Sequence, residues 1–165
     1  MPALQTGTAA PDFMLSSTDG KPFSLKEALV RGPVVAVFFK ISCPVCQYTM
    51  PFLERIYKTY GSKGATLVGI SQDNQQNTLK FMKEFGVSFP VLLDDESTYA
   101  VSNAYGLTTV PSIFWIAQDG EVEISSVGWA RKEIEDIHRK MAKASSTGPV
   151  PLFKSGEDAR DFRPG

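Results

Sequence analysis

Residues 34–46 constrain the fold of this chain more than any other stretch. They begin with six consecutive apolar residues, 34–39, and contain the chain's only two cysteines, Cys43 and Cys46. A short apolar run rich in β-branched and aromatic residues is typical of a strand buried on both faces of a sheet. Pro44 favours a helix start, because its missing N–H would be unpaired at that position anyway. We therefore expect Cys43 at the N-terminus of a helix that follows a central strand.

The C-x-x-C spacing of Cys43 and Cys46 has chemical consequences at a helix N-terminus. Unpaired N–H groups and the helix macrodipole favour an anion there, which makes the first sulfur of such a pair a nucleophilic thiolate. The second cysteine lies one turn further along the helix and can close a disulfide with the first. Thiol–disulfide exchange through a mixed disulfide requires this arrangement.

Two other interpretations of the cysteine pair are open. A C-x-x-C motif can be half of a zinc site, but a closed zinc site needs about four ligands. This chain has two cysteines and one histidine, His138, which lies in a distant charged stretch. Cys43 and Cys46 could also be unrelated buried residues. The strand–turn–helix context favours a redox dithiol over both alternatives, so we predict no metal site.

Composition sets further bounds on the function. The chain has 165 residues and a formal net charge of −1, so we expect one main domain without a nucleic-acid groove or a charged membrane surface. No apolar run is long enough to span a bilayer, and the first residues lack the basic start and apolar core of a signal peptide. We expect a cytoplasmic protein, although an exported protein whose signal had been removed would look the same.

Strand and helix patterns alternate along the chain. A hairpin is predicted at residues 12–23, and a helix that Ser24 can cap follows it at 25–30. Further strands are predicted at 34–39, 65–71, 89–93, 112–116 and 121–127, and further helices at 44–60, 79–85, 98–105 and 129–142. Such alternation implies crossover connections, while the turn at 119–120 adds an antiparallel edge. We predict a mixed sheet of about five strands with helices on both faces.

Two smaller features of these elements carry predictions. Asp94 and Asp95 form an acidic turn after the strand at 89–93. We interpret both as solvated loop and helix-cap groups, because two carboxylates without a third oxygen donor at loop spacing make a poor calcium site. Pro51 interrupts the helix that follows the cysteines and should kink it.

The end of the chain differs in composition from the rest. We divide the sequence into a domain of residues 1–143 and an extended tail of residues 144–165. The tail begins with a Ser, Thr, Gly and Pro run typical of a linker, and its remainder is charged. Leu152, Phe153 and Phe162 are its candidate anchors. We hypothesise that Leu152 and Phe153 dock on the domain or on a neighbouring chain.

Residues 9–142 resemble the thioredoxin superfamily, and within it the TlpA/ResA-like and AhpC/TSA (redoxin) branch. The resemblance rests on the segments APDF at 10–13, DGK at 19–21, CPVC at 43–46, FPVL at 89–92 and VP at 110–111. It implies an α/β fold, a thioredoxin-like three-layer α/β/α sandwich with a mixed central sheet and an N-terminal β-hairpin.

The resemblance also implies roles for individual residues. Cys43 would be the attacking thiolate and Cys46 the resolving thiol. Pro111 would be a cis-proline that faces the disulfide. Val110, which precedes it, would offer its backbone to an extended substrate segment.

Four residues would support this centre. Pro44 and Val45 would contact the substrate and tune the reduction potential, and Pro51 matches the helix-kink proline of the family. Lys40, three residues before the first cysteine, is a candidate to stabilise the thiolate, unless it is simply solvated.

The sequence departs from the family pattern at three positions. Thioredoxin proper has a buried Asp and a Trp where this chain has Val37 and Ser42, and many ResA-like proteins have a Glu where it has Thr49. A buried carboxylate that could relay the proton of Cys46 is therefore not evident. Either water moves that proton or the resolving step is slow.

Three functions are weighed. The first is a thiol–disulfide oxidoreductase that acts on protein or small-molecule disulfides, is served by an electron-donor reductase, and needs no cofactor, nucleic acid or membrane. The second is a peroxiredoxin-like peroxidase with Cys43 peroxidatic and Cys46 resolving. However, Lys40 and Ala36 replace the Thr and Pro of its motif, and Arg131 is the only plausible later arginine. The third is a non-catalytic binding module on the same fold.

Overall fold

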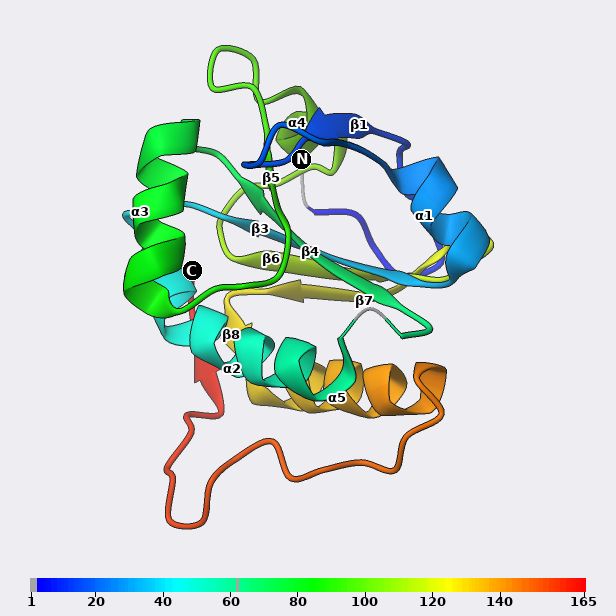
Figure 1. The fold of residues 1–165 in the computed structure, drawn as a ribbon, viewed down its shortest axis with the longest axis vertical. Coiled ribbons are helices and arrows are strands. Elements are labelled where there is room, and N and C mark those ends of the chain that lie inside the picture. Colours follow the sequence, from blue (N-terminus) through cyan, green and yellow to red (C-terminus); the bar gives the residue numbers. More distant parts are fainter. Residues whose placement is uncertain (1–2, 62) are drawn as a thin grey trace.

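A five-stranded mixed sheet forms the centre of the protein, as the computed structural model of residues 3–61 and 63–165 describes it. The strand order is β5-β4-β3-β6-β7 (Figure 1). The strands are β3 (Val34–Phe39), β4 (Thr66–Ser71), β5 (Val91–Leu93), β6 (Ser112–Ile116) and β7 (Val122–Val127). Strands β3, β4 and β5 run parallel, whereas β6 is antiparallel to both β3 and β7. The predicted mixed sheet is confirmed.

The central strand β3 is buried on both of its faces. All six of its residues have no exposed surface. Its odd-numbered residues belong to one hydrophobic cluster and its even-numbered residues to the other. An alternating polar pattern is absent from this run because neither face of the strand meets water.

Helices cover both faces of the sheet and make three layers (Figure 1). One cluster includes residues of α2 (Pro44–Tyr60), α3 (Gln75–Phe85) and α5 (Arg131–Ala144). The other includes residues of the hairpin β1 (Met14–Ser16) and β2 (Pro22–Ser24), of α1 (Leu25–Arg31) and of α4 (Ala100–Ala104). The thioredoxin-like three-layer sandwich with an N-terminal hairpin is therefore confirmed. In the described part of the chain, none of the helices is both long and apolar enough to cross a membrane.

Ser24 and Asp94 both bond the start of a helix, but Asp94 is buried and not solvated as predicted. The Ser24 hydroxyl accepts from the Glu27 N–H at 3.2 Å and caps α1 as predicted. Asp94 is 2% exposed, so the prediction that it is solvated is wrong. Its carboxylate accepts from the Ser102 N–H at 2.8 Å, the Ser102 hydroxyl at 2.7 Å and the Val101 N–H at 3.2 Å. Three donors from the α4 region compensate the loss of water.

The start of the last helix also differs from the prediction. Helix α5 begins at Arg131, and Trp129 belongs instead to the short strand β8 (Trp129–Ala130). This strand pairs antiparallel with β9 (Phe162–Arg163), which lies near the end of the sequence. The helical pattern at Trp129 reflected its burial, but its backbone pairs with a strand some thirty residues away that local sequence does not reveal.

The tail docks on the body of the protein. After α5 it passes along α2 and α5 and returns to β8 (Figure 1). Leu152 is buried in the cluster of α2 and α5, and the ring of Phe153 packs on that of Phe52 with centroids 5.5 Å apart. The hypothesis that Leu152 and Phe153 dock on the domain is confirmed. Phe162 is 60% exposed, so its prediction as an anchor is wrong.

Candidate active site

Cys43 lies where the sequence predicts, at the N-cap of α2 just beyond the end of β3. Its side chain is partly exposed, and its Sγ accepts a hydrogen bond from the Cys46 N–H at 3.1 Å. Pro44 occupies the first turn of the helix. The Cys46 N–H of that turn therefore points at the sulfur, and a donor in this position favours negative charge.

The loop between β3 and Cys43 is held by two polar side chains that sequence reasoning missed. The Asp73 carboxylate accepts from the Ile41 N–H at 2.8 Å, and the Gln47 side-chain amide donates to the Ile41 carbonyl at 2.9 Å. Asp73 follows β4, which runs parallel to β3, so both strand ends meet at the same edge of the sheet. That topology is the signal by which Asp73 could have been found.

Cys46 lies in a very different environment from Cys43. Both cysteines are free thiols, but Cys46 has no exposed surface. Burial, reinforced by the hydrogen bond with Cys43, raises the pKa of the Cys46 thiol well above its ordinary value. Cys46 is therefore a protonated thiol at neutral pH, and its proton must leave before it can act as a nucleophile.

In residues 3–61 and 63–165, no acidic side chain is hydrogen-bonded to Cys46. Thr49, one turn beyond Cys46, is buried and donates its hydroxyl to the Val45 carbonyl at 2.7 Å. Glu54 is the buried acidic residue of α2, and its carboxylate accepts from the Ser88 N–H at 2.8 Å. Thr49 has no carboxylate, and the carboxylate of Glu54 is bonded to Ser88. Neither residue therefore supplies the proton relay that the sequence left in doubt.

A second loop brings Val110 and Pro111 to the cysteines. The Val110–Pro111 peptide bond is cis, as the resemblance implied. The Val110 carbonyl accepts a hydrogen bond from the Cys43 thiol at 3.5 Å. The structure thus brings Val110 to Cys43, which lies 67 residues earlier in the sequence.

A cavity of about 430 Å³ opens beside Cys43. Its lining includes Lys40, Cys43, Pro44, Gln72, Tyr99, Asn103, Thr109, Val110 and Gly165. Val45, which was predicted to contact the substrate, is buried in the core instead, and Pro51 lies inside α2. Neither of these two residues lines the cavity as the described residues define it.

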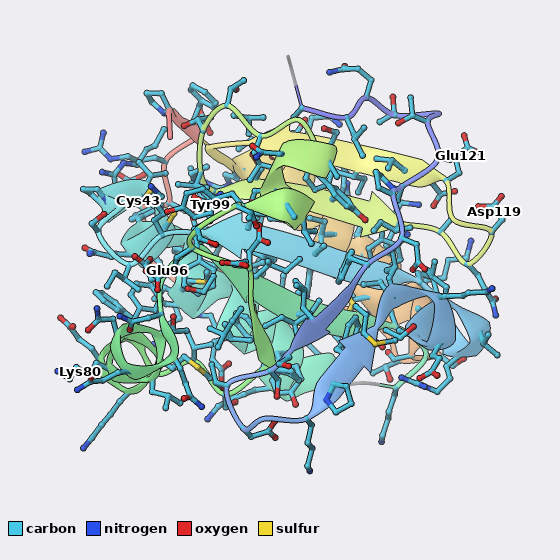
Figure 2. The ribbon with its side chains drawn as sticks, turned by 90° about the horizontal axis from the view of Figure 1, so that it is seen from above. Cys43, Lys80, Glu96, Tyr99, Asp119 and Glu121 are labelled. Atoms are coloured by element: carbon cyan, nitrogen blue, oxygen red, sulfur yellow. The ribbon has the colours of Figure 1, made fainter. Side chains whose placement is uncertain are left out.

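Lys40 and Tyr99 form one wall of this cavity. The Lys40 ammonium lies 5.6 Å from the centre of the Tyr99 ring, a cation–π distance. Figure 2 shows Tyr99 at the same end of the sheet as Cys43, with Asp119 and Glu121 at the opposite end. Lys40 thus contributes a positive charge to the site. Tyr99 carries no signal in its local sequence, because α4 brings it there from a distant part of the chain.

Two other candidate groups lie away from Cys43. Arg131 donates to Glu135 at 2.9 Å and to the Ala159 carbonyl at 3.1 Å, so its guanidinium is committed to the tail. His138 is buried and lies 3.0 Å from the Tyr60 hydroxyl. Across residues 3–61 and 63–165, no group of three or more His, Cys, Asp or Glu side chains is arranged to hold a metal ion.

The sequence of this chain is similar to that of known proteins. Residues 6–125 match the sequence model of the AhpC/TSA family. The thiol-disulfide oxidoreductase ResA of Geobacillus thermodenitrificans is 31% identical to this chain over 142 residues, which span 86% of this chain and 80% of that protein.

Solved structures of other proteins are similar to this one in fold. A thiol:disulfide interchange protein of the thioredoxin family from Chlorobium tepidum is 29% identical, with a TM-score of 0.68 over 86% of this chain and 97% of that one. The peroxidoxin BcpB from Mycobacterium tuberculosis is 23% identical, with a TM-score of 0.69 over 87% and 97%. At that identity the second likeness concerns the fold alone.

Proposed function

This chain belongs to the AhpC/TSA family and is a thiol–disulfide oxidoreductase, and we propose that it works through Cys43 as the nucleophile and Cys46 as the resolving thiol. One observation carries this assignment of roles. Cys43 is partly exposed at the helix N-terminus, where the Cys46 N–H donates to its sulfur, whereas Cys46 is buried behind it. Only the first sulfur can reach a substrate disulfide.

The proposed reaction has two exchange steps. The Cys43 thiolate attacks one sulfur of the substrate disulfide, whose S–S bond breaks, and the first substrate thiolate leaves and takes up a proton. Cys46 then loses its proton and attacks Cys43 Sγ. The mixed disulfide breaks, the second substrate thiolate leaves and is protonated, and a Cys43–Cys46 disulfide remains. Two electrons have passed from the protein to the substrate.

The electrons that this reaction uses determine which cofactor, electron donor and substrate the protein needs. The two thiols supply both electrons, so we propose no cofactor beyond the redox-active pair. An electron donor of the reductase class must return two electrons to the Cys43–Cys46 disulfide before another cycle. Substrates are disulfides, and the reduction potential of the pair decides whether the protein reduces or forms them in its own setting.

The test uses variants of the two cysteines and two oxidants. The reduced protein should lose its free thiols when it meets a disulfide, either bis(2-hydroxyethyl) disulfide or insulin, and Cys43→Ser should abolish that loss. Cys46→Ser should form a stable mixed disulfide that mass spectrometry detects. An insulin reductase activity that survives in Cys43→Ser would contradict the proposal, and rapid thiol loss with hydrogen peroxide alone would favour a peroxidase instead.

A further inference from the structure

Residues 162–165, which we call the tail strap, lie against the backbone beside the nucleophile. Strand β9 in this strap pairs antiparallel with β8. A Cβ placed on Gly165 would lie 2.2 Å from the Val110 carbonyl oxygen and 2.7 Å from the Thr109 hydroxyl. A Cβ on Gly128 would lie 2.4 Å from the Arg163 carbonyl oxygen. The strap is therefore in close contact with the loop of Thr109 and Val110, which touches Cys43, and with the turn at Gly128.

The backbone of Val110 is the natural pairing site for a polypeptide next to Cys43. Within the described part of the chain, no hydrogen bond uses the Val110 N–H, and the Val110 carbonyl is bonded only by the Cys43 thiol. Extended peptides bind proteins by pairing with such unpaired backbone groups. Gly165 lies where a polypeptide that paired with Val110 would have to lie.

Hydrogen bonds hold the residues just before the strap. The Trp129 indole N–H donates to the Arg160 carbonyl at 2.5 Å, and the Arg131 N–H donates to the Asp161 carbonyl at 2.9 Å. The Tyr48 hydroxyl accepts from the Arg160 N–H at 3.1 Å.

Two charged contacts hold the tail on either side of these bonds. Arg55 donates to both carboxylate oxygens of Glu157 at 2.6 and 2.7 Å. The guanidinium of Arg163 lies 4.9 Å from the centre of the Tyr48 ring. Every one of these groups belongs to the body or the tail of the same chain, so the strap is built into the fold.

The strap leaves a cavity open at Cys43, and Gly165 is part of its lining. Its volume of about 430 Å³ lies in the range of sites for small molecules. Lys40, Gln72 and Asn103 give it polar walls, and Gly165 of the strap bounds it beside Val110.

We propose that the tail strap is a specificity element, which closes the polypeptide side of the site and selects low-molecular-weight disulfides that enter through this cavity. The inference rests on the proposed function, since it concerns the substrate that Cys43 attacks. Attack on a small disulfide needs only the cavity, whereas attack on a disulfide within a polypeptide requires the space beside Val110 that Gly165 fills.

The experiment compares two substrates in the full chain and in a variant that lacks residues 162–165. The value of kcat/KM is measured with insulin and with bis(2-hydroxyethyl) disulfide. Removing the strap should raise kcat/KM for insulin by about tenfold or more and change that for the small disulfide less than about twofold. Ser155→Ala, an exposed change elsewhere in the tail, is the matched control and should leave both values unchanged.

A full-length variant guards against misfolding of the shortened chain. Arg163→Ala removes the contact with Tyr48 and should shift the substrate ratio in the same direction by a smaller factor. The inference is overturned if both substrates gain or lose equally in both variants, or if the full chain already prefers insulin. Failure of the proposed function would look different, because Cys43→Ser would then keep its activity with both substrates.

Discussion

At the scale of single residues, the two cysteines differ because the helix gives them different surroundings. Cys43 stands at the helix N-terminus beside a cavity, whereas Cys46 lies one turn inside and is fully buried. Burial raises the pKa of the Cys46 thiol. In the proposed reaction, the first exchange step is thus open to substrate, and the second depends on removing a proton from a buried sulfur.

We predict that the resolving step speeds up with pH. While Cys46 stays below its raised pKa, its thiolate fraction and hence the rate of release should rise about tenfold per pH unit from about pH 6 to about pH 9. The measurement is stopped-flow release of thionitrobenzoate from a mixed disulfide with Cys43. Cys46→Ser should show no such release, and a rate that is flat with pH in the native sequence would contradict the prediction.

At the scale of elements, close packing between strands and helices positions the site. Gly69 in β4 faces Phe39, the last residue of β3, and lies near Phe89 and Val91. A Cβ at Gly69 would lie 3.2 Å from Phe39 and Phe89 and 3.3 Å from Val91. A missing side chain in β4 therefore makes room for the aromatic residue that leads into the cysteine loop.

Replacing Gly69 should destabilise the protein by overpacking. We expect Gly69→Ala to lower the free energy of unfolding by about 1–3 kcal/mol, because the rings of β3 and their neighbours must move. Gly148→Ala is the matched control, since a Cβ there meets no atom within 4 Å. Denaturant unfolding would measure both, and equal stability of the two variants would show that the core can absorb the added methyl group.

The contact of the tail with α2 should depend on pH. Its hydrogen bonds with Arg55 lower the pKa of the Glu157 carboxyl to about 2. Because this value lies below that of an unfolded glutamate, near 4.3, the pair stabilises the docked tail above about pH 4.3 and this stabilisation is lost as the pH falls toward 2.

We therefore expect acid to release the tail around Glu157 before the body unfolds. Trp129 fluorescence should report this release, because its indole N–H donates to the Arg160 carbonyl. The fluorescence should change between about pH 4.5 and pH 2.5 in the native sequence. In Glu157→Gln this acid transition should be absent, and a transition that persists in that variant would assign it to another carboxylate.

At the scale of the whole molecule, the tail is part of the folded body. It covers the outer face of α2 and α5, where Leu152 and Ala159 are buried and Phe153 packs against Phe52. Arg131 extends this contact by placing its guanidinium 4.4 Å from the centre of the Phe153 ring. Apolar surface of the helices would meet water if the tail were removed.

Deletion of residues 145–165 should lower the melting temperature. Exposure of the surfaces around Leu152 and Phe153 should cost about 2–4 kcal/mol, which corresponds to roughly 5–15 °C for a chain of this size. Differential scanning calorimetry would measure the shift, with Ser155→Ala as a control that leaves it unchanged. An unchanged melting temperature after deletion would mean that the tail adds no stability.

Much of the fold follows from short-range patterns in the sequence. The six apolar residues of β3 and the position of Pro44 predict the strand and the helix start, and thereby the place of Cys43 at the helix N-cap. These predictions succeed because burial and helix initiation depend on neighbours within one or two turns of chain. The hairpin and the order of strands and helices follow in the same way.

Tertiary structure alone decides the surroundings of that thiol. It places Tyr99 beside Lys40, pairs β8 with β9, and brings Gly165 to Val110. Arg55 and Glu157, which hold the tail, are 102 residues apart in the sequence. No local propensity encodes a contact over that distance, because its free energy arises only after the sheet and its helices have formed. The sequence by itself therefore determines the place of Cys43 at the start of its helix, whereas the folded chain determines which side chains and backbone groups surround its sulfur.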